Sequence, residues 1–273
     1  MIEFHNYAVA PYAPGAGGGY LPESTALFAR FTTPPTNARK TLINTLIKTL
    51  KDGGVWSKLD ALYLTAAADA QAARRNWISD AFNLTAINSP TFTTDRGYAG
   101  DGSSSYLNTG FNPTTVSSPM YMQNSSHISA WNRTTRAATD KSLMGARQST
   151  TKYIDLGPRI VSGGGGFLGR MGGVTGFIEP NTNSDGHFVV NRASSAGFEG
   201  YRNASPLGSA AIASITPPNS FIALLGRSFN DSTADALTTD QIAAATIGGS
   251  LSAGDVSILN GALNAYLIAI GAA

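Results

Sequence analysis

From Phe82 to Gly226 the sequence consists of short runs rich in β-branched and aromatic residues, separated by clusters of Gly, Pro, Asn and Ser. The runs recur at intervals of roughly ten residues and include SYLNTGF, SHISAWNRT, KYIDLGP, HFVVNR and SFIALLGR. Strands of this length and spacing are typical of a β-sandwich or barrel. The pattern therefore predicts two packed, antiparallel sheets over residues 82–226.

Helical patterns flank this region on both sides. In PPTNARKTLINTLIKTLKDGG the apolar residues form one stripe, which predicts a helix over residues 36–52. The following stretch, KLDALYLTAAADAQAARRNWI, is predicted to be helical as well, with an Ala-rich middle that favours two short pieces. At the end of the chain, Ser252 and Asp255 have the spacing of a capping box, and an apolar stripe follows them. A closing helix is expected over residues 252–270.

Residues 1–23 combine three prolines and a Gly17–Gly19 run with the aromatic residues Phe4, Tyr7, Tyr12 and Tyr20. Such a composition forms neither a helix nor a central strand. The segment is either a loose terminus or an extended arm whose aromatics dock on a neighbouring subunit, and four aromatics favour the arm. The predicted organisation is an arm over 1–23, a helical segment over 24–80, and a sandwich with its closing helix over 81–273.

Composition excludes several classes of protein. Charged residues make up 13% of the chain, against roughly 25% in an average soluble domain. The net charge is +2 without a basic stripe, which argues against nucleic acid as a partner. The absence of cysteine excludes disulfides and thiolate metal sites. The sequence shows neither a secretory signal nor an apolar run long enough to span a membrane. We therefore expect a protein made in a cytoplasm.

The glycine-rich stretch DRGYAGDGSSSYLNTG at residues 95–110 resembles a ligand-binding loop at first sight. It lacks the Gly-Lys-Ser/Thr of a phosphate loop and the ligand spacing of a calcium-binding EF-hand. Asp-Gly between two strand-like halves favours a hairpin turn, so we expect Gly100–Gly102 to connect two strands and to bind no phosphate. An alternative is a turn in which Asp95 or Asp101 also contacts a metal ion or a sugar.

Catalytic patterns are missing. Only four glutamates occur, and no acidic pair alternates along a strand as a glycosidase on such a fold would require. His5, His127 and His187 lie far apart in the sequence, and His127 and His187 are expected to be strand residues that form hydrogen bonds at a sheet edge. No serine lies in a Gly-x-Ser-x-Gly elbow. We expect no enzyme activity, no metal and no cofactor, although calcium stays open.

Glycan binding needs fewer features, namely an aromatic ring to stack on a sugar and polar groups for its hydroxyls. Three clusters meet these requirements: Trp131 with Asn132 and Arg133, Tyr153 with Asp155, and Tyr201 with Arg202 and Asn203. The competing interpretation of each aromatic is a core or subunit contact.

Three stretches carry a resemblance to a known group: FTTPPTNARKTLINTLIKTLKDGGVWSKLDALYL, ARRNWISDAFNLTAINSPTFTTDRGYAGDGSSSYLNTGFNP and IGGSLSAGDVSILNGALNAYLIAIG. They resemble virion proteins of tailed phages and prophages whose central domain is similar to the concanavalin A-like, laminin-G-like jelly roll. The resemblance covers residues 30–273. It implies a spike, fibre or decoration protein that joins other virion subunits, forms a homo-oligomer and contacts host surface polysaccharide. It transfers no catalytic residue to this chain.

The resulting prediction is a mainly β jelly-roll sandwich with an N-terminal arm, helices and a C-terminal helix, located in a virion and without enzyme activity. Two other functions stay open. One is a glycan-degrading depolymerase with a site between strands or subunits, and the other is an assembly scaffold without a ligand. The arm and the helix at 36–52 are expected to mediate attachment to other subunits.

Overall fold

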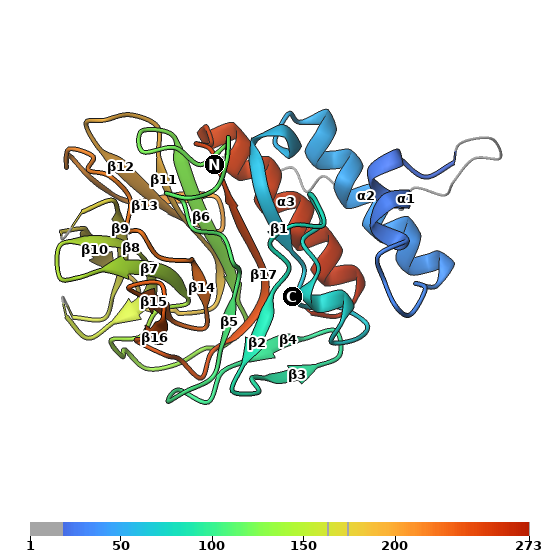
Figure 1. The fold of residues 1–273 in the computed structure, drawn as a ribbon, viewed down its shortest axis with the longest axis horizontal. Helices are drawn as coiled ribbons and strands as arrows, with labels where there is room; N and C mark the ends of the chain where they lie inside the picture. The colour runs from blue at the N-terminus through green and yellow to red at the C-terminus, as the bar shows by residue number, and fades with distance from the viewer. Residues whose placement is uncertain (1–18, 163, 174, 273) are drawn as a thin grey trace, which may run out of the picture.

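A computed structural model describes residues 19–162, 164–173 and 175–272 of the 273-residue chain. Two sheets form its centre, and Figure 1 shows them packed against each other. The first sheet has the order β13-β12-β11-β6-β17-β4-β3, and β1 also pairs with β17. Its strands are β1 (Leu59–Tyr63), β3 (Thr91–Thr93), β4 (Gly97–Ala99), β6 (Ser126–Asn132), β11 (Gly186–Arg192), β12 (Phe198–Arg202), β13 (Ser205–Ala210) and β17 (Gln241–Gly248).

The second sheet has the order β10-β9-β8-β7-β14-β5-β2, and β15 and β16 join it beside β7. Its strands are β2 (Thr85–Ile87), β5 (Tyr106–Asn108), β7 (Met144–Gln148), β8 (Lys152–Ile160), β9 (Gly166–Met171), β10 (Phe177–Pro180), β14 (Ala223–Leu224), β15 (Arg227–Phe229) and β16 (Thr233–Asp235). Strand pairs between Phe82 and Gly226 are antiparallel. The jelly-roll sandwich that the sequence predicts is confirmed.

Aromatic side chains fill the space between the sheets. The rings of Phe167 on β9 and Phe188 on β11 lie 5.2 Å apart, so they join the second sheet to the first. Phe177 on β10 packs edge-on against Phe167 at the same distance. Glycine is required beside it, because a Cβ at Gly200 would lie 2.2 Å from the Phe177 ring and one at Gly169 would lie 2.3 Å from it. These small residues let the ring enter the core.

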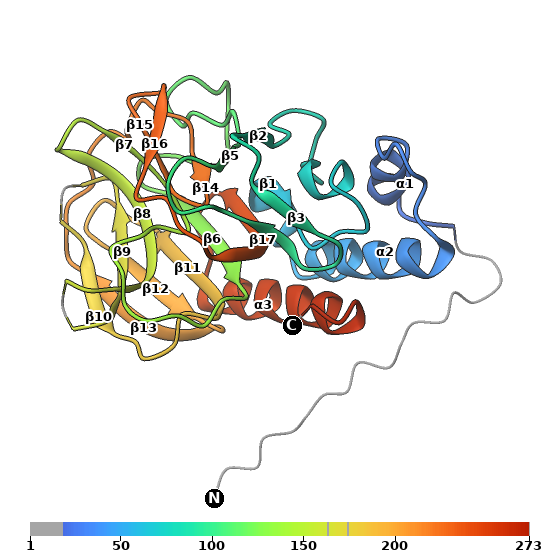
Figure 2. The same ribbon diagram turned by 90° about the horizontal axis from the view of Figure 1, so that it is seen from below.

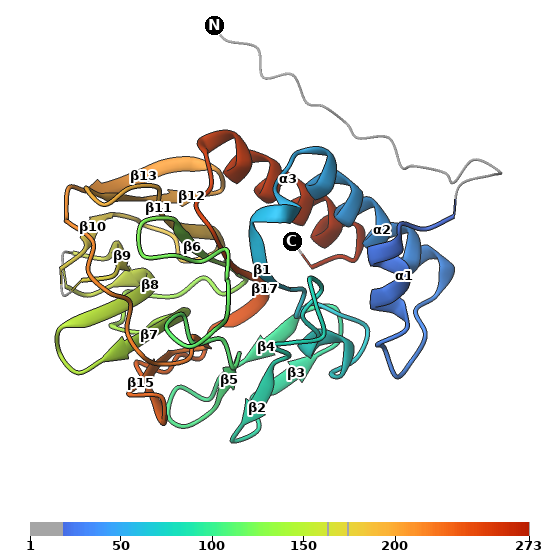
Figure 3. The same ribbon diagram turned by 45° about the horizontal axis from the view of Figure 1, so that its top comes forward.

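Three helices lie outside the sandwich: α1 (Pro22–Phe28), α2 (Asn37–Asp52) and α3 (Ala253–Ala269). Figures 2 and 3 show α3 running along the side of the first sheet that faces away from the second, with α2 and α1 beyond it. Thr36 caps α2. Ser252 and Asp255 form the capping box of α3, as the sequence predicts. The predicted helices at 36–52 and 252–270 are therefore confirmed to within a residue. Among the described residues, no helix has the length and apolar character needed to cross a membrane.

The second predicted helix, from KLDALYL onward, is wrong. Leu59–Tyr63 forms β1, which pairs with β17 inside the first sheet. Ala61, Leu62, Tyr63 and Leu64 are completely buried, which means that the strand is covered on both faces. A strand of this kind has a continuous apolar run and no alternation, so its sequence does not differ from a short helical run. The predicted helical segment 24–80 therefore contributes a strand to the sandwich.

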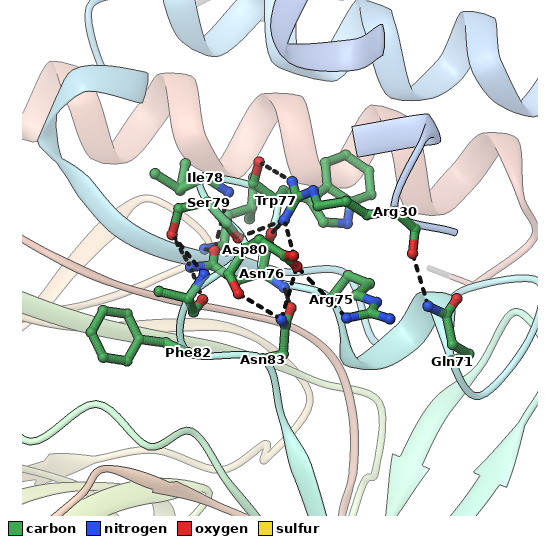
Figure 4. A network of polar contacts seen from close by, with 12 residues as sticks. Arg30, Gln71, Arg75, Asn76, Trp77, Ile78, Ser79, Asp80, Phe82 and Asn83 are labelled. Atoms are coloured by element: carbon green, nitrogen blue, oxygen red, sulfur yellow. Dashed lines mark hydrogen bonds and ion pairs between the residues drawn. The ribbon is translucent and has the colours of Figure 1, made fainter. Parts of the chain in front are cut away.

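The stretch after β1 is held by hydrogen bonds to side chains, as Figure 4 shows around Asn76. The fully buried Asn76 accepts bonds from the Leu62 and Ile78 amides and donates to the carbonyl oxygens of Asp60 and Ala81. Arg30, just after α1, donates to the carbonyl oxygens of Asn76, Trp77 and Ser79. These bonds fix an irregular loop in place of the expected helix.

Gly100–Gly102 does connect two strands, but the predicted hairpin is wrong. The preceding strand, β4, pairs with β3 and β17 in the first sheet, whereas the following strand, β5, pairs with β2 and β14 in the second. The loop is therefore a crossing between the sheets. Asp101 organises it, because its carboxylate accepts hydrogen bonds from the amides of Ser103, Ser104 and Ser105.

Candidate functional site

A polar groove of about 500 Å³ lies where β6 ends and β11 begins, next to helix α3. The two strands are paired there, with His187 opposite Trp131 and Gly186 opposite Asn132. The groove is lined by Trp131, Asn132, Arg133, Asp185, Gly186, Asn203, Asn260 and Asn264. An aromatic ring, four side-chain amides and two opposite charges therefore meet in one cavity. Such groups hold a polar ligand in a fixed orientation.

Trp131 forms the aromatic wall of the groove, and the neighbouring ring is that of His187. Their rings are stacked, with centres 5.7 Å apart and planes 15° from parallel. Trp131 is 8% exposed and His187 is completely buried beneath it. The indole therefore presents only a small part of its surface, and hydrogen bonds have to supply most of the affinity for a ligand in this groove.

Asn260 and Asn264 come from α3, four residues apart and therefore on one face of the helix. The Oδ1 atom of Asn260 is buried, and the Asn260 amide is a hydrogen-bond partner of the His187 ring. The two asparagines therefore bring side-chain amides of α3 to the wall of the groove.

Burial lowers the pKa of His187 to about 3, and the nearby Asn260 amide only partly opposes this shift. His187 is therefore neutral at physiological pH, with one donor and one acceptor on its ring. A neutral imidazole without a carboxylate partner has no means to act as a strong base here. His187 does not line the groove, and its ring stacks against the Trp131 indole. β6 and β11, which carry His127 and His187, are inner strands of the first sheet, so the predicted position of these histidines at a sheet edge is wrong.

The charged residues of the groove are held by their neighbours. Arg133 donates to the side-chain oxygen of Gln241 at 2.6 Å and to the carbonyl oxygen of Ala272 at 2.5 Å. Burial, together with the nearby Arg96, lowers its pKa. Asp185 accepts a bond from Arg202 Nη2 at 3.0 Å. Both groups are thereby fixed in position before a ligand arrives.

Asn203 and Gly186 shape the corner between β11 and the β12–β13 turn. The Oδ1 atom of Asn203 accepts the His187 amide at 2.8 Å. Gly186 has a φ of 105°, and a Cβ there would lie 2.5 Å from this oxygen. Any larger residue at position 186 would therefore displace Asn203 and close the corner.

The structure separates the residues that the sequence predicts as glycan-binding. Trp131 and Arg133 line the groove, and Arg202 reaches its edge through Asp185. Tyr201 lies outside the groove and is only 3% exposed, so it offers no ring face to a sugar. Tyr153 is on β8 in the second sheet, where the guanidinium carbons of Arg170 and Arg227 lie 4.9 and 5.2 Å from its ring centre.

Of the residues predicted for assembly, Phe4, Tyr7 and Tyr12 lie outside the described residues. Tyr20 is 38% exposed and packs edge-on against Phe28 of α1, with 5.2 Å between ring centres. The attachment role of this segment stays a prediction.

Asn132 and Asn203, which the sequence predicts as polar partners of Trp131 and Tyr201, both line the groove. Three further lining residues were not predicted: Asp185, Asn260 and Asn264. A signal existed for the last two, because they stand four residues apart within an otherwise apolar helix. Asp185 and Asn203 lie in loops that only the pairing of β11 with β6 and β12 brings together. No sequence spacing indicates that contact.

Within residues 19–162, 164–173 and 175–272, no group of three or more His, Asp or Glu side chains could hold a metal ion. The two carboxylates considered for such a role have other partners. Asp95 pairs with Arg39 at 2.7 Å, and Asp101 accepts bonds from its own loop.

No protein-family model matches the sequence, and a search of curated proteins gives no match. Solved structures are similar in fold. The receptor binding domain of botulinum neurotoxin C/D mosaic serotype is 14% identical, with a TM-score of 0.52 over 74% of this chain and 51% of that chain. The binding domain of botulinum neurotoxin serotype D is 14% identical, with a TM-score of 0.50 over 75% and 52%.

This chain spans about half the length of both toxin chains. Domain 4 of AbnA, a GH43 extracellular arabinanase from Geobacillus stearothermophilus in complex with arabinotriose, is 17% identical over 74% of this chain and 98% of that one, with a TM-score of 0.48. At these identities the two toxin domains establish likeness in fold only: the chain has the β-sandwich architecture of these binding domains.

Proposed function

We propose that this protein binds a glycan without cleaving it, and that the groove lined by Trp131, Asn260 and Asn264 is the binding site. The observation that carries the proposal is the meeting of a tryptophan ring with four side-chain amides, those of Asn132, Asn203, Asn260 and Asn264, in one groove. Sugar hydroxyls both donate and accept hydrogen bonds, and side-chain amides offer both functions.

The charge of the groove supports a largely uncharged segment of polysaccharide. Arg133 and Asp185 oppose each other, and each is already bonded to a neighbour. An anionic sugar would gain little from Arg133 while it approached Asp185. Neutral hydroxyl groups match the amides without that conflict.

Binding without hydrolysis is part of the proposal. Among the described residues that line the groove, Asp185 alone carries a carboxylate. Glycosidases need two carboxyl groups about 5 to 10 Å apart. Both Asp185 carboxylate oxygens already accept hydrogen bonds, one from Arg202 and the other from Thr135 Oγ1. A depolymerase would need a second carboxylate from another subunit.

We further propose that binding serves the attachment of a virion to its host, with this chain as a homo-oligomeric spike, fibre or decoration protein. The support is the resemblance of three sequence stretches to virion proteins of tailed phages, and the use of the same fold in a toxin receptor binding domain. In this proposal the arm over residues 1–23 and α2 contact other virion subunits. Deletion of residues 1–23 should leave a folded sandwich that no longer joins particles, whereas normal incorporation of the truncated protein would contradict this role.

The test of the glycan site is a glycan array followed by calorimetric titration of the strongest ligand. Asn264→Leu should weaken binding at least about tenfold, because the variant leaves sugar hydroxyls without a partner. The matched control is Tyr153→Ala on the other sheet, which should leave affinity unchanged. If only the Tyr153→Ala variant lost binding, the glycan would bind at the face that carries Tyr153 and not in the groove. An array without signal would favour the assembly scaffold, and release of reducing ends from host polysaccharide would favour the depolymerase.

A further inference from the structure

The corner of the polar groove beside the β12–β13 turn combines two side chains that a ligand can reach. Asp185 and Asn203 both line the groove; the Asp185 side chain is 42% exposed, and Asn203 is exposed as well. A Cβ at Gly186 would lie within 3.0 Å of the Oδ1, Nδ2 and Cγ atoms of Asn203. The Asn203 amide therefore lies against the Asp185–Gly186 segment, and the two side chains share one corner.

The existing hydrogen bonds of this corner leave one donor group and one acceptor group for a ligand. Asn203 Oδ1 accepts the backbone N–H of His187 at 2.8 Å, which orients the side chain and leaves its Nδ2 group to donate. The two carboxylate oxygens of Asp185 each accept one bond, from Arg202 and from Thr135. A carboxylate has about four acceptor positions, so Asp185 can accept a further N–H or O–H group.

Trp131 supplies an apolar contact of limited size beside this corner. It is the partner of His187 across the β6–β11 pair, and the backbone of His187 is bonded to Asn203. Trp131 is 8% exposed, which leaves about 20 Å² of the roughly 250 Å² that a tryptophan side chain can offer. That area is too small to stack on the face of a whole sugar ring, but it suffices for one methyl group.

The charges of the groove lie at its two ends. Arg133 is bonded to Gln241 of β17, whereas Asp185 is bonded to Arg202 of β12, and β11 and β6 run between these strands. An anionic substituent in the Asp185 corner would meet a carboxylate and no nearby free cation. An ammonium group would gain little, because Arg202 already pairs with Asp185 at 3.0 Å. The corner therefore favours a neutral substituent that carries an N–H group, a carbonyl oxygen and a methyl group.

We propose that this corner binds the acetamido group of a 2-acetamido sugar. The acetamido N–H donates to the Asp185 carboxylate, the carbonyl oxygen accepts from Asn203 Nδ2, and the methyl group lies on the exposed part of Trp131. This inference rests on the proposed glycan function and names the class of sugar that the groove selects.

Titrations of the full chain with methyl glycosides test the selectivity. The glycosides of N-acetylglucosamine and N-acetylgalactosamine should bind at least about tenfold more tightly than those of glucose and galactose, because the hexoses leave the donor and the acceptor of the corner without their partners. Glucosamine, which carries an ammonium group, and fucose, which carries a methyl group without an amide, should bind as weakly as the hexoses. Saturation transferred from the protein to the bound sugar should be strongest at the acetyl methyl protons.

Asp185→Ala removes the acceptor of the acetamido N–H from an exposed position. The variant should lose most of the preference for N-acetylglucosamine over glucose, a fall of about tenfold in the ratio of the two affinities. Thr135→Val is the matched control. It removes one hydrogen bond to the Asp185 carboxylate but leaves the carboxylate in place, so it should keep the preference.

The outcomes separate this inference from the proposed function. If acetamido sugars and hexoses bind equally well, and Asn264→Leu weakens both, the groove binds glycans but the acetamido selectivity is wrong. If Asp185→Ala keeps the full preference, or if fucose binds as tightly as N-acetylglucosamine, the assignment of this corner is overturned. If no glycan binds to the native chain, the proposed function fails and this inference fails with it.

Discussion

The guanidinium carbon of Arg192 lies 5.0 Å from the ring centre of Phe198, in a place that no water reaches, since Arg192 is completely buried. Its nitrogens donate to four carbonyl oxygens, those of Met171, Ser194, Gly197 and Ile212. Among the described residues no carboxylate forms an ion pair with it. One cation thus joins the end of β9, the β11–β12 turn and the segment after β13.

Replacement of Arg192 tests how much its hydrogen bonds contribute to the stability of the fold. Arg192→Met should lower the free energy of unfolding by about 3 kcal/mol or more, because several buried carbonyl oxygens lose their donor. Urea denaturation measures the change. Arg202→Met is the control on the neighbouring strand, where the ion pair with Asp185 is half-exposed and contributes less than about 1 kcal/mol. Equal losses in the two variants would contradict the role of Arg192.

Asp155 is a second buried charge whose removal gives a measurable result. It is completely buried, accepts a bond from Ser142 Oγ, and pairs with Arg227 at 2.6 Å and with Arg170 at 3.3 Å. Asp155→Asn should cost about 2 to 4 kcal/mol in urea denaturation, below the highest values for buried pairs because both arginines are partly exposed.

Asp235 provides the comparison for Asp155. It also pairs with Arg227, at 2.7 Å, but its side chain is 30% exposed. Asp235→Asn should therefore cost less than about 1 kcal/mol. If the exposed aspartate proved as important as the buried one, burial would not be what makes the Asp155 pair strong.

The fold could be predicted from the sequence where apolar residues or turn residues recur at a regular spacing. The helix at 37–52 shows its apolar stripe, and the strands after Phe82 are separated by turn residues. β1 could not be predicted, because a strand buried on both faces has no alternation to distinguish it from a helix. The hairpin predicted at Gly100 is wrong for a related reason. Asp-Gly indicates that the chain changes direction, but it does not indicate whether the two strands it joins belong to the same sheet.

The polar groove could be predicted from the sequence only in part. Trp131 and Arg133 are neighbours on one strand, so their proximity follows from the sequence. Asn260 reaches them only because α3 covers the first sheet, and Asp185 and Asn203 arrive through the pairing of β11 with β6 and β12. These contacts depend on tertiary structure, which no spacing of residue types encodes on its own.

Stability should fall in weak acid because of His127 and His187. Nδ1 of His127 donates to Gly249 O at 2.5 Å, and Nε2 accepts from the Thr246 hydroxyl at 2.9 Å. Burial lowers the pKa of His127 from 6.5 to about 4, and that of His187 from 6.5 to about 3. Below pH 6.5 both histidines bind protons in the unfolded chain but not in the folded chain. Each histidine therefore lowers the free energy of unfolding by up to about 1.4 kcal/mol for every unit by which the pH falls.

His127→Gln tests this expectation, because glutamine keeps a donor and an acceptor but does not titrate. Urea midpoints of the native chain should decline between pH 6.5 and pH 4, and the variant should show a shallower decline over the same range. Identical slopes would assign the acid sensitivity to His187 or to other groups.

Asp101, in the loop at residues 100–105, has a lowered pKa, and for a carboxyl group this means a charged form that stabilises the fold. The amides of Ser104, Ser105 and Ser103, with the Ser104 hydroxyl, donate to Asp101 and hold its pKa far below its ordinary value of 3.8. The Asp101 carboxyl carbon should therefore show no titration in ¹³C spectra down to pH 3, where an ordinary aspartate is largely protonated. Since the folded pKa is depressed, the stabilising effect of Asp101 is complete above about pH 4 and is lost as the pH falls toward the folded pKa. The difference in melting temperature between the native chain and Asp101→Ala should accordingly narrow between pH 4 and pH 2. A difference that stays constant over that range would mean that these hydrogen bonds do not favour the charged carboxylate.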